Sequence, residues 1–116
     1  MNSPTSEHVV RQYFEMWNSG DQTLAEAVLS PDFVDFAHPE VKGLAAFKNT
    51  LEKTKTFFPD FHIDILSIAS DADTVLVLGS ISRTAKGEKT VTECLWAFKV
   101  AEGRILNWKT GTIATP

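Results

Sequence analysis

The chain has 116 residues, a formal net charge of −4 and an apolar content of 43%. This length fits one domain over residues 1–116, and the apolar content is sufficient for a single packed core. Lys and Arg are scattered singly, so the electrostatic footprint of a nucleic-acid-binding protein is missing. The only cysteine, Cys94, excludes an internal disulfide and a cysteine-based zinc site.

The N-terminal stretch MNSPTSEH is polar and lacks the apolar core of a secretory signal. The longest aliphatic run, VLVL at 75–78, is far too short to cross a bilayer. We therefore expect a soluble, cytoplasmic protein that binds neither a membrane nor a nucleic acid.

The first part of the chain has helical periodicity. Ser3 and Pro4 form a favourable helix start, and apolar residues then recur at helical spacing until Gly20, a natural stop. Asp21 can cap a short second helix, which we expect Pro31 to end.

A short strand and a third helix follow. The strand is FVDF at 33–36, and the helix is expected over 44–58, where apolar side chains share one face. Pro59 ends this helix.

Beyond Pro59 the apolar period changes from helical to alternating. Turns about every dozen residues separate four alternating runs, which predicts an antiparallel meander with strands at 61–68, 74–84, 89–100 and 104–113. Three helices gathered on such a sheet make an α+β domain. We expect the bent sheet, with the short first strand added, to form a cone around the three helices. The third helix should lie on its concave side, and the open end should hold a small-molecule pocket.

These elements carry five distinctive segments: RQYFEMWNSGD, PDFVDF, GLAAF, FPDF and GRILNW. Together they resemble a SnoaL-like or ketosteroid-isomerase-like member of the nuclear transport factor 2-like superfamily, over nearly the whole chain. The resemblance implies a homodimer through the outer face of the sheet, a face that still carries Leu95 and Ala97. The superfamily includes isomerases, polyketide cyclases, dehydratases and non-catalytic binding modules, so the fold does not fix the function.

Tyr13 is a candidate oxyanion donor. It lies seven residues before the Gly20-Asp21 pair, which is the spacing of the tyrosine that stabilises the substrate oxyanion in the isomerases that the chain resembles. Their second donor, a protonated aspartate, aligns with Trp96, and the triplet at 107–109 is Asn-Trp-Lys where many SnoaL-like sequences have His-Trp-Asp. The alternative is that Tyr13 is an ordinary core tyrosine.

Asp35 and His38 are candidates for the catalytic base. In the isomerases the base is an aspartate before a proline; here His38 precedes Pro39, and Asp35 shares a strand face with Ala37, which aligns with that base. Apolar surroundings disfavour a charged carboxylate, and histidine titrates near neutral pH, so either group can accept a proton. We rank Asp35 slightly ahead. The alternative is that both side chains are solvated at the ragged end of a strand.

The expected pocket walls come mainly from one face of the 89–100 strand. Alternation places Thr92, Cys94 and Trp96 together on that face, and Trp17 and Trp108 are further wall candidates. The alternative is core packing, which is the commoner role of a buried cysteine or aromatic residue.

Two functions remain open. The first is a cofactor-independent isomerase, cyclase or lyase that removes a proton beside the carbonyl of a flat apolar compound and stabilises the resulting enolate. The second is a non-catalytic module that binds a hydrophobic ligand or docks a protein. Convergence of Tyr13 with Asp35 or His38 on one cavity would favour the enzyme, and a wholly apolar cavity would favour the binding module.

Overall fold

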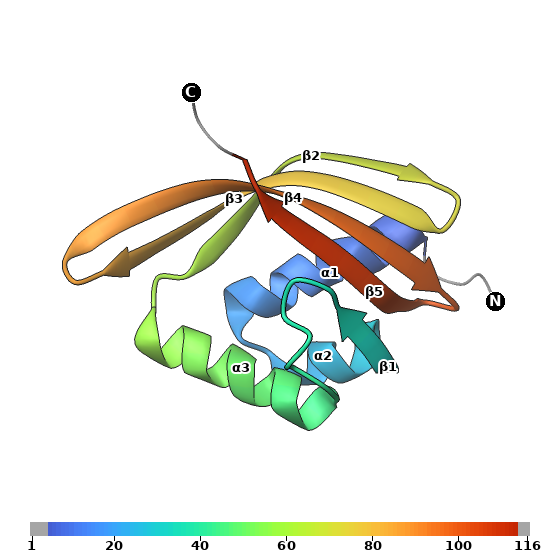
Figure 1. Cartoon of the computed structure of the whole chain (residues 1–116), viewed down its shortest axis with the longest axis horizontal. Helices are drawn as coiled ribbons and strands as arrows, with labels where there is room; N and C mark the ends of the chain where they lie inside the picture. The colour runs from blue at the N-terminus through green and yellow to red at the C-terminus, as the bar shows by residue number, and fades with distance from the viewer. Residues whose placement is uncertain (1–4, 114–116) are drawn as a thin grey trace.

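A computed structural model describes residues 5–113 of the chain (Figure 1). Three helices and five strands follow in the order α1 (Ser6–Ser19), α2 (Gln22–Val28), β1 (Leu29–Asp35), α3 (Leu44–Phe57), β2 (His62–Asp71), β3 (Thr74–Ala85), β4 (Glu88–Ala101) and β5 (Arg104–Thr112). None of the helices in this described part is both long and apolar enough to span a membrane.

The strands form one sheet in the order β1-β5-β4-β3-β2. The last four strands pair antiparallel, as predicted. β1 instead pairs parallel with β5, with Leu29 beside Ile105 and Asp35 beside Trp108, so the sheet is mixed rather than wholly antiparallel. A parallel pair needs a long connection, and here α3 and three strands lie between the two partners in the chain.

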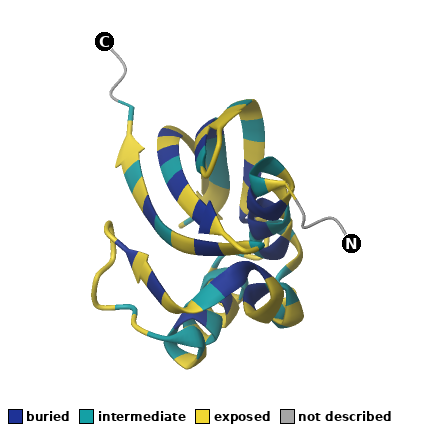
Figure 2. Cartoon of the chain, turned by 90° about the vertical axis from the view of Figure 1, so that its right-hand side faces the viewer, coloured by how far each residue is buried: buried dark blue, intermediate teal, exposed yellow. Residues whose placement is uncertain are grey.

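The sheet bends over the helices, and all three helices, α3 included, lie on its concave side (Figure 1). Burial alternates along the strands, so that one face is covered by helices and the other is exposed (Figure 2). This is the predicted α+β arrangement.

The start of α1, the end of α2 and the start of β1, at Leu29 rather than Phe33, differ from the sequence prediction. α1 is capped by Thr5, whose hydroxyl accepts a hydrogen bond from the His8 N–H at 3.1 Å, while Ser3 and Pro4 lie outside the described residues. α2 ends at Val28, so that Pro31 lies within β1 and does not end the helix. Proline is tolerated there because β1 is an edge strand and its pairing with β5 is irregular after Leu29.

Asn18 joins α1 to the start of the meander. Its side-chain N–H donates to the Ile63 carbonyl at 2.9 Å, and its side-chain oxygen accepts from the Ile63 N–H at 2.7 Å. The Lys55 ammonium donates to the carbonyls of Asn18 and Phe61 and so ties the end of α3 to the same point. Sequence periodicity gives no sign of this bridge.

The core beneath the sheet is aromatic. The Tyr13 ring lies 5.1 Å from Phe98, 5.4 Å from Trp108 and 6.4 Å from Phe47, measured between ring centroids. Phe33 stacks on Trp108 at 5.4 Å. Helices α1 and α3 and strands β1, β4 and β5 therefore meet at one point, and this cluster forms one end of the cavity described next.

Candidate functional site

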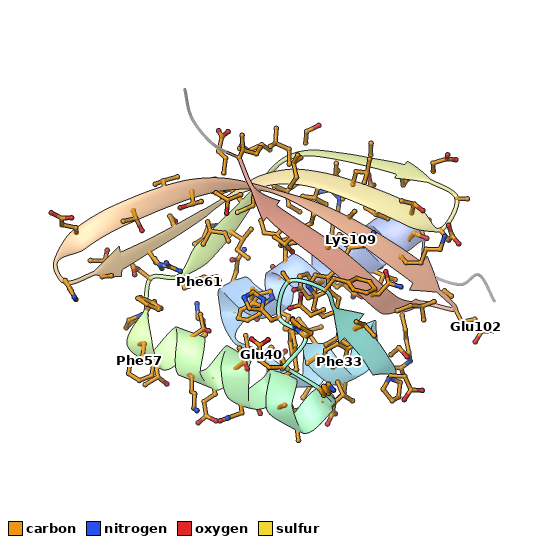
Figure 3. All side chains as sticks on the ribbon, in the orientation of Figure 1. Phe33, Glu40, Phe57, Phe61, Glu102 and Lys109 are labelled. Atoms are coloured by element: carbon orange, nitrogen blue, oxygen red, sulfur yellow. The ribbon has the colours of Figure 1, made fainter. Side chains whose placement is uncertain are left out.

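A cavity of about 450 Å³ lies between the concave face of the sheet and α3. This volume is in the range of small-molecule pockets. Figure 3 labels two of its lining residues, Glu40 and Phe61. The lining comes from every layer of the fold: Tyr13, Trp17, Asp35, His38, Glu40, Val41, Phe47, Thr50, Thr54, Phe58, Phe61, Ile63, Ile81, Arg83, Trp96, Trp108 and Thr110.

Tyr13 is held on the inner face of α1 with 4% of its surface exposed. Burial raises the pKa of its hydroxyl far above the usual range; the indole of Trp17 opposes this shift, and the charge of Asp35 adds to it. Burial has this direction because it disfavours the charged phenolate. Tyr13 therefore keeps its proton at neutral pH and can act only as a neutral hydrogen-bond donor or acceptor.

Asp35 and His38 form a hydrogen-bonded pair. The carboxylate Oδ1 of Asp35 accepts hydrogen bonds from the backbone N–H groups of Ala37 and His38, at 2.9 and 3.2 Å. Its Oδ2 lies 3.2 Å from His38 Nδ1. The Asp35 side chain is 11% exposed and that of His38 is 65% exposed, so the carboxylate lies at the base of the turn and the imidazole at the cavity mouth.

The local chain explains this placement. Asp35 is the last residue of β1, and its side chain points inward like that of Phe33, two residues earlier. The chain then turns, and an aspartate side chain readily bonds the backbone N–H groups that follow it in such a turn. Tyr13, Asp35 and His38 thus all line one cavity, while their roles in catalysis stay predictions.

The predicted walls are placed unequally. Trp17, Trp96 and Trp108 line the cavity, but Thr92 and Cys94 are not among the lining residues. Cys94 is 4% exposed, and burial raises the pKa of its thiol. Thr92 is exposed near the β3–β4 hairpin. Strand alternation identifies the inner face, but it does not tell how far along the strand the helices cover that face.

Sequence reasoning missed several lining residues on α3 and β3. Thr50 and Thr54 follow Phe47 at helical spacing and so share its face of α3. Arg83 follows Ile81 on the inward side of β3. The helical period of α3 and the alternation of β3 predict these positions when polar residues are counted together with the apolar ones.

Among the residues that the structure describes, 5–113, no group of three or more His, Cys, Asp or Glu side chains is arranged to hold a metal ion. Instead, the cavity combines an aromatic wall, one buried hydroxyl and one carboxylate–imidazole pair. Such an arrangement can bind a flat apolar molecule and place a proton acceptor and a hydrogen-bond donor against it.

Solved structures with the same fold support this picture of the chain. A SnoaL-like polyketide cyclase from Agrobacterium tumefaciens superposes with a TM-score of 0.82 at 14% identity, covering 95% of this chain and 92% of that one. IdmH from Streptomyces antibioticus gives 0.79 at 20% identity, with 94% and 92% covered. A protein of ketosteroid isomerase-like fold from Catenulispora acidiphila, in complex with trimethylamine, gives 0.76 at 15% identity, with 95% and 86% covered. At these identities the likeness concerns the fold alone.

The sequence itself carries the assignment. No protein of curated function is matched by the sequence. The profile of the SnoaL-like domain matches residues 10–108, which is most of the chain and extends from within α1 to the middle of β5. The chain therefore belongs to the SnoaL-like domain family.

Proposed function

We propose that the protein is an enzyme that moves a proton on an apolar carbonyl compound, without a cofactor, as an isomerase, cyclase or lyase. One observation carries this proposal: the Tyr13 hydroxyl and the Asp35–His38 pair line the same largely aromatic cavity. A proton acceptor and an oxyanion donor on one cavity are the minimum that enolate chemistry needs. The fold shared with a SnoaL-like polyketide cyclase is consistent with it.

In this proposal His38 is the base and Asp35 positions it. The Nδ1–H of His38 would donate to Asp35 Oδ2, which leaves Nε2 to accept the substrate proton. The carboxylate then stabilises the imidazolium that forms, as in other carboxylate–histidine pairs. Asp35 is less suited to act directly, because both of its oxygens are already engaged within the turn.

Tyr13 is the proposed oxyanion donor. Its burial keeps the hydroxyl protonated at neutral pH, so it can donate a hydrogen bond to the enolate oxygen. A donor preorganised in this way is commonly the largest single contribution to such catalysis. Return of the proton to another carbon gives isomerisation, attack of the enolate carbon on a second carbonyl gives cyclisation, and loss of a leaving group gives elimination.

A non-catalytic hydrophobic-ligand-binding module is the second candidate. The turn hydrogen bonds of Asp35 favour it, since a purely structural aspartate makes the same bonds to Ala37 and His38. In that case the cavity would bind its ligand, and the Asp35–His38 pair would only shape the rim.

The two candidates can be separated with bicyclic and tricyclic ketones. Thermal shift identifies the ketones that bind, since a ligand stabilises the state it binds. NMR in D2O then follows exchange of the protons beside the carbonyl. We expect wild type to accelerate exchange, His38→Gln to abolish the acceleration, and Tyr13→Phe to reduce it by about a hundredfold or more.

Asp35 is tested by two variants. Asp35→Asn should slow exchange while leaving ketone binding intact, and Asp35→Glu should restore part of the rate, because a carboxylate again faces His38. Binding of ketones by wild type without any accelerated exchange would contradict the enzyme proposal and support the binding module.

We also propose that the protein is a homodimer through the outer face of the sheet. Leu76 and Leu95 are 54% and 52% exposed there, and with Ala97 and Gly111 they line a shallow apolar groove. Contiguous exposed apolar surface of this kind is typical of an interaction site. A second copy of the chain would present the same apolar face about a two-fold axis.

Sedimentation tests the dimer. Wild type should sediment as a dimer at high micromolar concentration, and Leu95→Lys should sediment as a monomer with unchanged circular dichroism. Glu93→Gln is a suitable control, since it alters an exposed residue of the same strand outside the groove. A wild-type monomer at that concentration would overturn the proposal.

A further inference from the structure

We propose that Arg83 and Phe58 form a subsite for an anionic oxygen group, so that the ligand of the cavity is an aromatic carbonyl compound carrying a carboxylate or similar acid. This rests on the proposed function only for the carbonyl; the anion subsite itself is a matter of binding. Arg83 and Phe58 both line the cavity, at the ends of different elements.

The guanidinium of Arg83 is positioned but unpaired. Its central carbon lies 5.0 Å above the centre of the Phe58 ring, a cation–π contact that holds the planar group over the aromatic face. Within residues 5–113, no carboxylate lies within ion-pair distance of Arg83, and its guanidinium donates no hydrogen bond to the protein. All five N–H donors are therefore available to an oxyanion, which they can bind in a bidentate manner.

The carboxylate of Asp60, which is two residues after Phe58, is engaged elsewhere. Asp60 follows α3 closely, but its oxygens accept hydrogen bonds from the Thr84 N–H at 3.0 Å and the Thr84 hydroxyl at 2.6 Å. These bonds lower the pKa of Asp60, the side-chain bond first and the backbone bond second. Asp60 thus braces the strand beside Arg83 without neutralising it.

Charge is distributed unevenly along the cavity. Asp35 and Glu40 belong to the end formed by β1 and the loop after it, whereas Arg83 lies toward the β3–β4 hairpin, on the other side of the molecule (Figure 1). An anion is repelled at the first end and attracted at the second. A ligand with one acidic group would therefore bind with its acid at Arg83 and its remaining part toward Tyr13.

Helix α3 sets the spacing between these two ends. Phe47 packs against Tyr13, and Phe58 lies under Arg83. The two phenylalanines are 11 residues apart in sequence, which corresponds to about 16 Å along a helix axis. Thr50 and Thr54 line the cavity between them. This favours an elongated ligand of two or more rings, with the acid and the reacting carbonyl at opposite ends.

A matched pair of fluorescent probes tests the subsite. 8-Anilinonaphthalene-1-sulfonate is a flat aromatic anion, and N-phenyl-1-naphthylamine is the same scaffold without the sulfonate. We expect Arg83→Gln to weaken binding of the sulfonate by about twofold to fivefold, the range for an ion pair with an exposed side chain such as that of Arg83. Binding of the neutral probe should be unchanged.

Three controls make the result specific. Lys53→Gln removes one positive charge from an exposed position of α3 and should leave both probes unaffected. Leu95→Lys alters the outer groove and should not weaken the sulfonate, which places the binding in the cavity. Arg83→Lys should retain part of the affinity, since the charge remains but the bidentate geometry is lost.

Two results would overturn the subsite: equal weakening by Arg83→Gln and Lys53→Gln, or no weakening by Arg83→Gln. Added salt should weaken the sulfonate in wild type more than in Arg83→Gln, because the interaction is electrostatic. These are equilibrium measurements, so the subsite can stand if proton exchange is absent, and it can fail while exchange is present.

Discussion

The two faces of the sheet differ although the same strands build both. On β4, Trp96 and Phe98 are 5% and 1% exposed, whereas Val91 and Leu95, earlier on the same strand, are 64% and 52% exposed. The inner residues form the core and the cavity wall, and the outer ones are available for association. Alternation along a strand thus separates the surface that forms the core and the cavity wall from the exposed surface that we propose to bind a second copy.

The largest expected effect comes from substitutions on the two faces of β4. Phe98→Ala should lower the free energy of unfolding by about 3–5 kcal/mol, the usual cost of removing a buried phenylalanine and leaving a cavity. Val91→Ala, on the outer face, should change it by less than about 1 kcal/mol, since most exposed substitutions have small effects. Urea denaturation of both variants gives the two values. Similar costs at the two positions would mean that the inner face is not the core.

A second test makes one substitution at two glycines. Gly79 lies on β3, where an added Cβ would be 2.7 Å from the Asp64 carbonyl and 3.0 Å from the Trp96 ring. Gly79→Ala should therefore cost about 1–3 kcal/mol, the range for overpacking.

Gly111 provides the matched control for this change. An added Cβ there meets nothing within 4 Å, so Gly111→Ala should be close to neutral. Denaturant midpoints of the two variants give the comparison directly. A neutral Gly79→Ala would show that both the Asp64 carbonyl and the Trp96 ring can shift, and that the inner face is less tightly packed than its burial indicates.

Much of the fold could be predicted because its signals are local. The change of period after Pro59 marks the start of the meander, and Gly20 marks the end of α1 as expected. The pairing of β1 with β5 could not be predicted, because Leu29 and Ile105 are distant in sequence and no turn joins them. The start of β1 could not be predicted either. Pro31 is typical of the end of a helix, and proline is acceptable in this strand only because β1 lies at the edge of the sheet.

The site was predictable to the extent that side-chain direction follows periodicity. Tyr13 faces the core and Asp35 faces inward, as helix and strand periods indicate. The hydrogen bond between the Asp35 carboxylate and the His38 imidazole, and the bridge from Asn18 to Ile63, depend on how the chain folds in three dimensions. No residue spacing reveals them. The position of Arg83 at the cavity follows strand parity, but only the structure shows that no carboxylate among residues 5–113 forms an ion pair with it.

A third prediction concerns the buried hydroxyl of the inner face. Tyr13 is the only tyrosine in the chain, so the ultraviolet absorbance of tyrosinate reports on it alone. Its pKa is raised by burial, and we expect its titration in the folded protein to begin well above pH about 10, the usual value for tyrosine. Circular dichroism recorded on the same samples identifies the pH at which the protein unfolds.

The same shift has a consequence for stability. Above pH 10 the unfolded chain loses the tyrosine proton while the folded protein keeps it, so the unfolded state binds fewer protons and the free energy of unfolding falls as pH rises. The slope from this one group is at most about 1.4 kcal/mol per pH unit. Below pH 10 both states are protonated and the contribution is constant. Tyr13→Phe should remove this part of the alkaline slope, and an unchanged slope in that variant would contradict the burial of the hydroxyl.

The smallest expected effect on stability is at Thr92, near the end of the inner face of β4. Thr92 shares the face of Cys94 and Trp96, yet it is exposed and does not line the cavity. Thr92→Val keeps the β-branched shape and removes only the hydroxyl, so it should change the free energy of unfolding by no more than about 0.5 kcal/mol and should leave N-phenyl-1-naphthylamine binding unaltered. Thr54→Val makes the same change on α3, at a residue that does line the cavity. There the affinity for the neutral probe should increase, because the wall becomes more apolar. An equal change in affinity for both variants would mean that the cavity extends along β4 to the hairpin, and that strand parity alone had identified its wall.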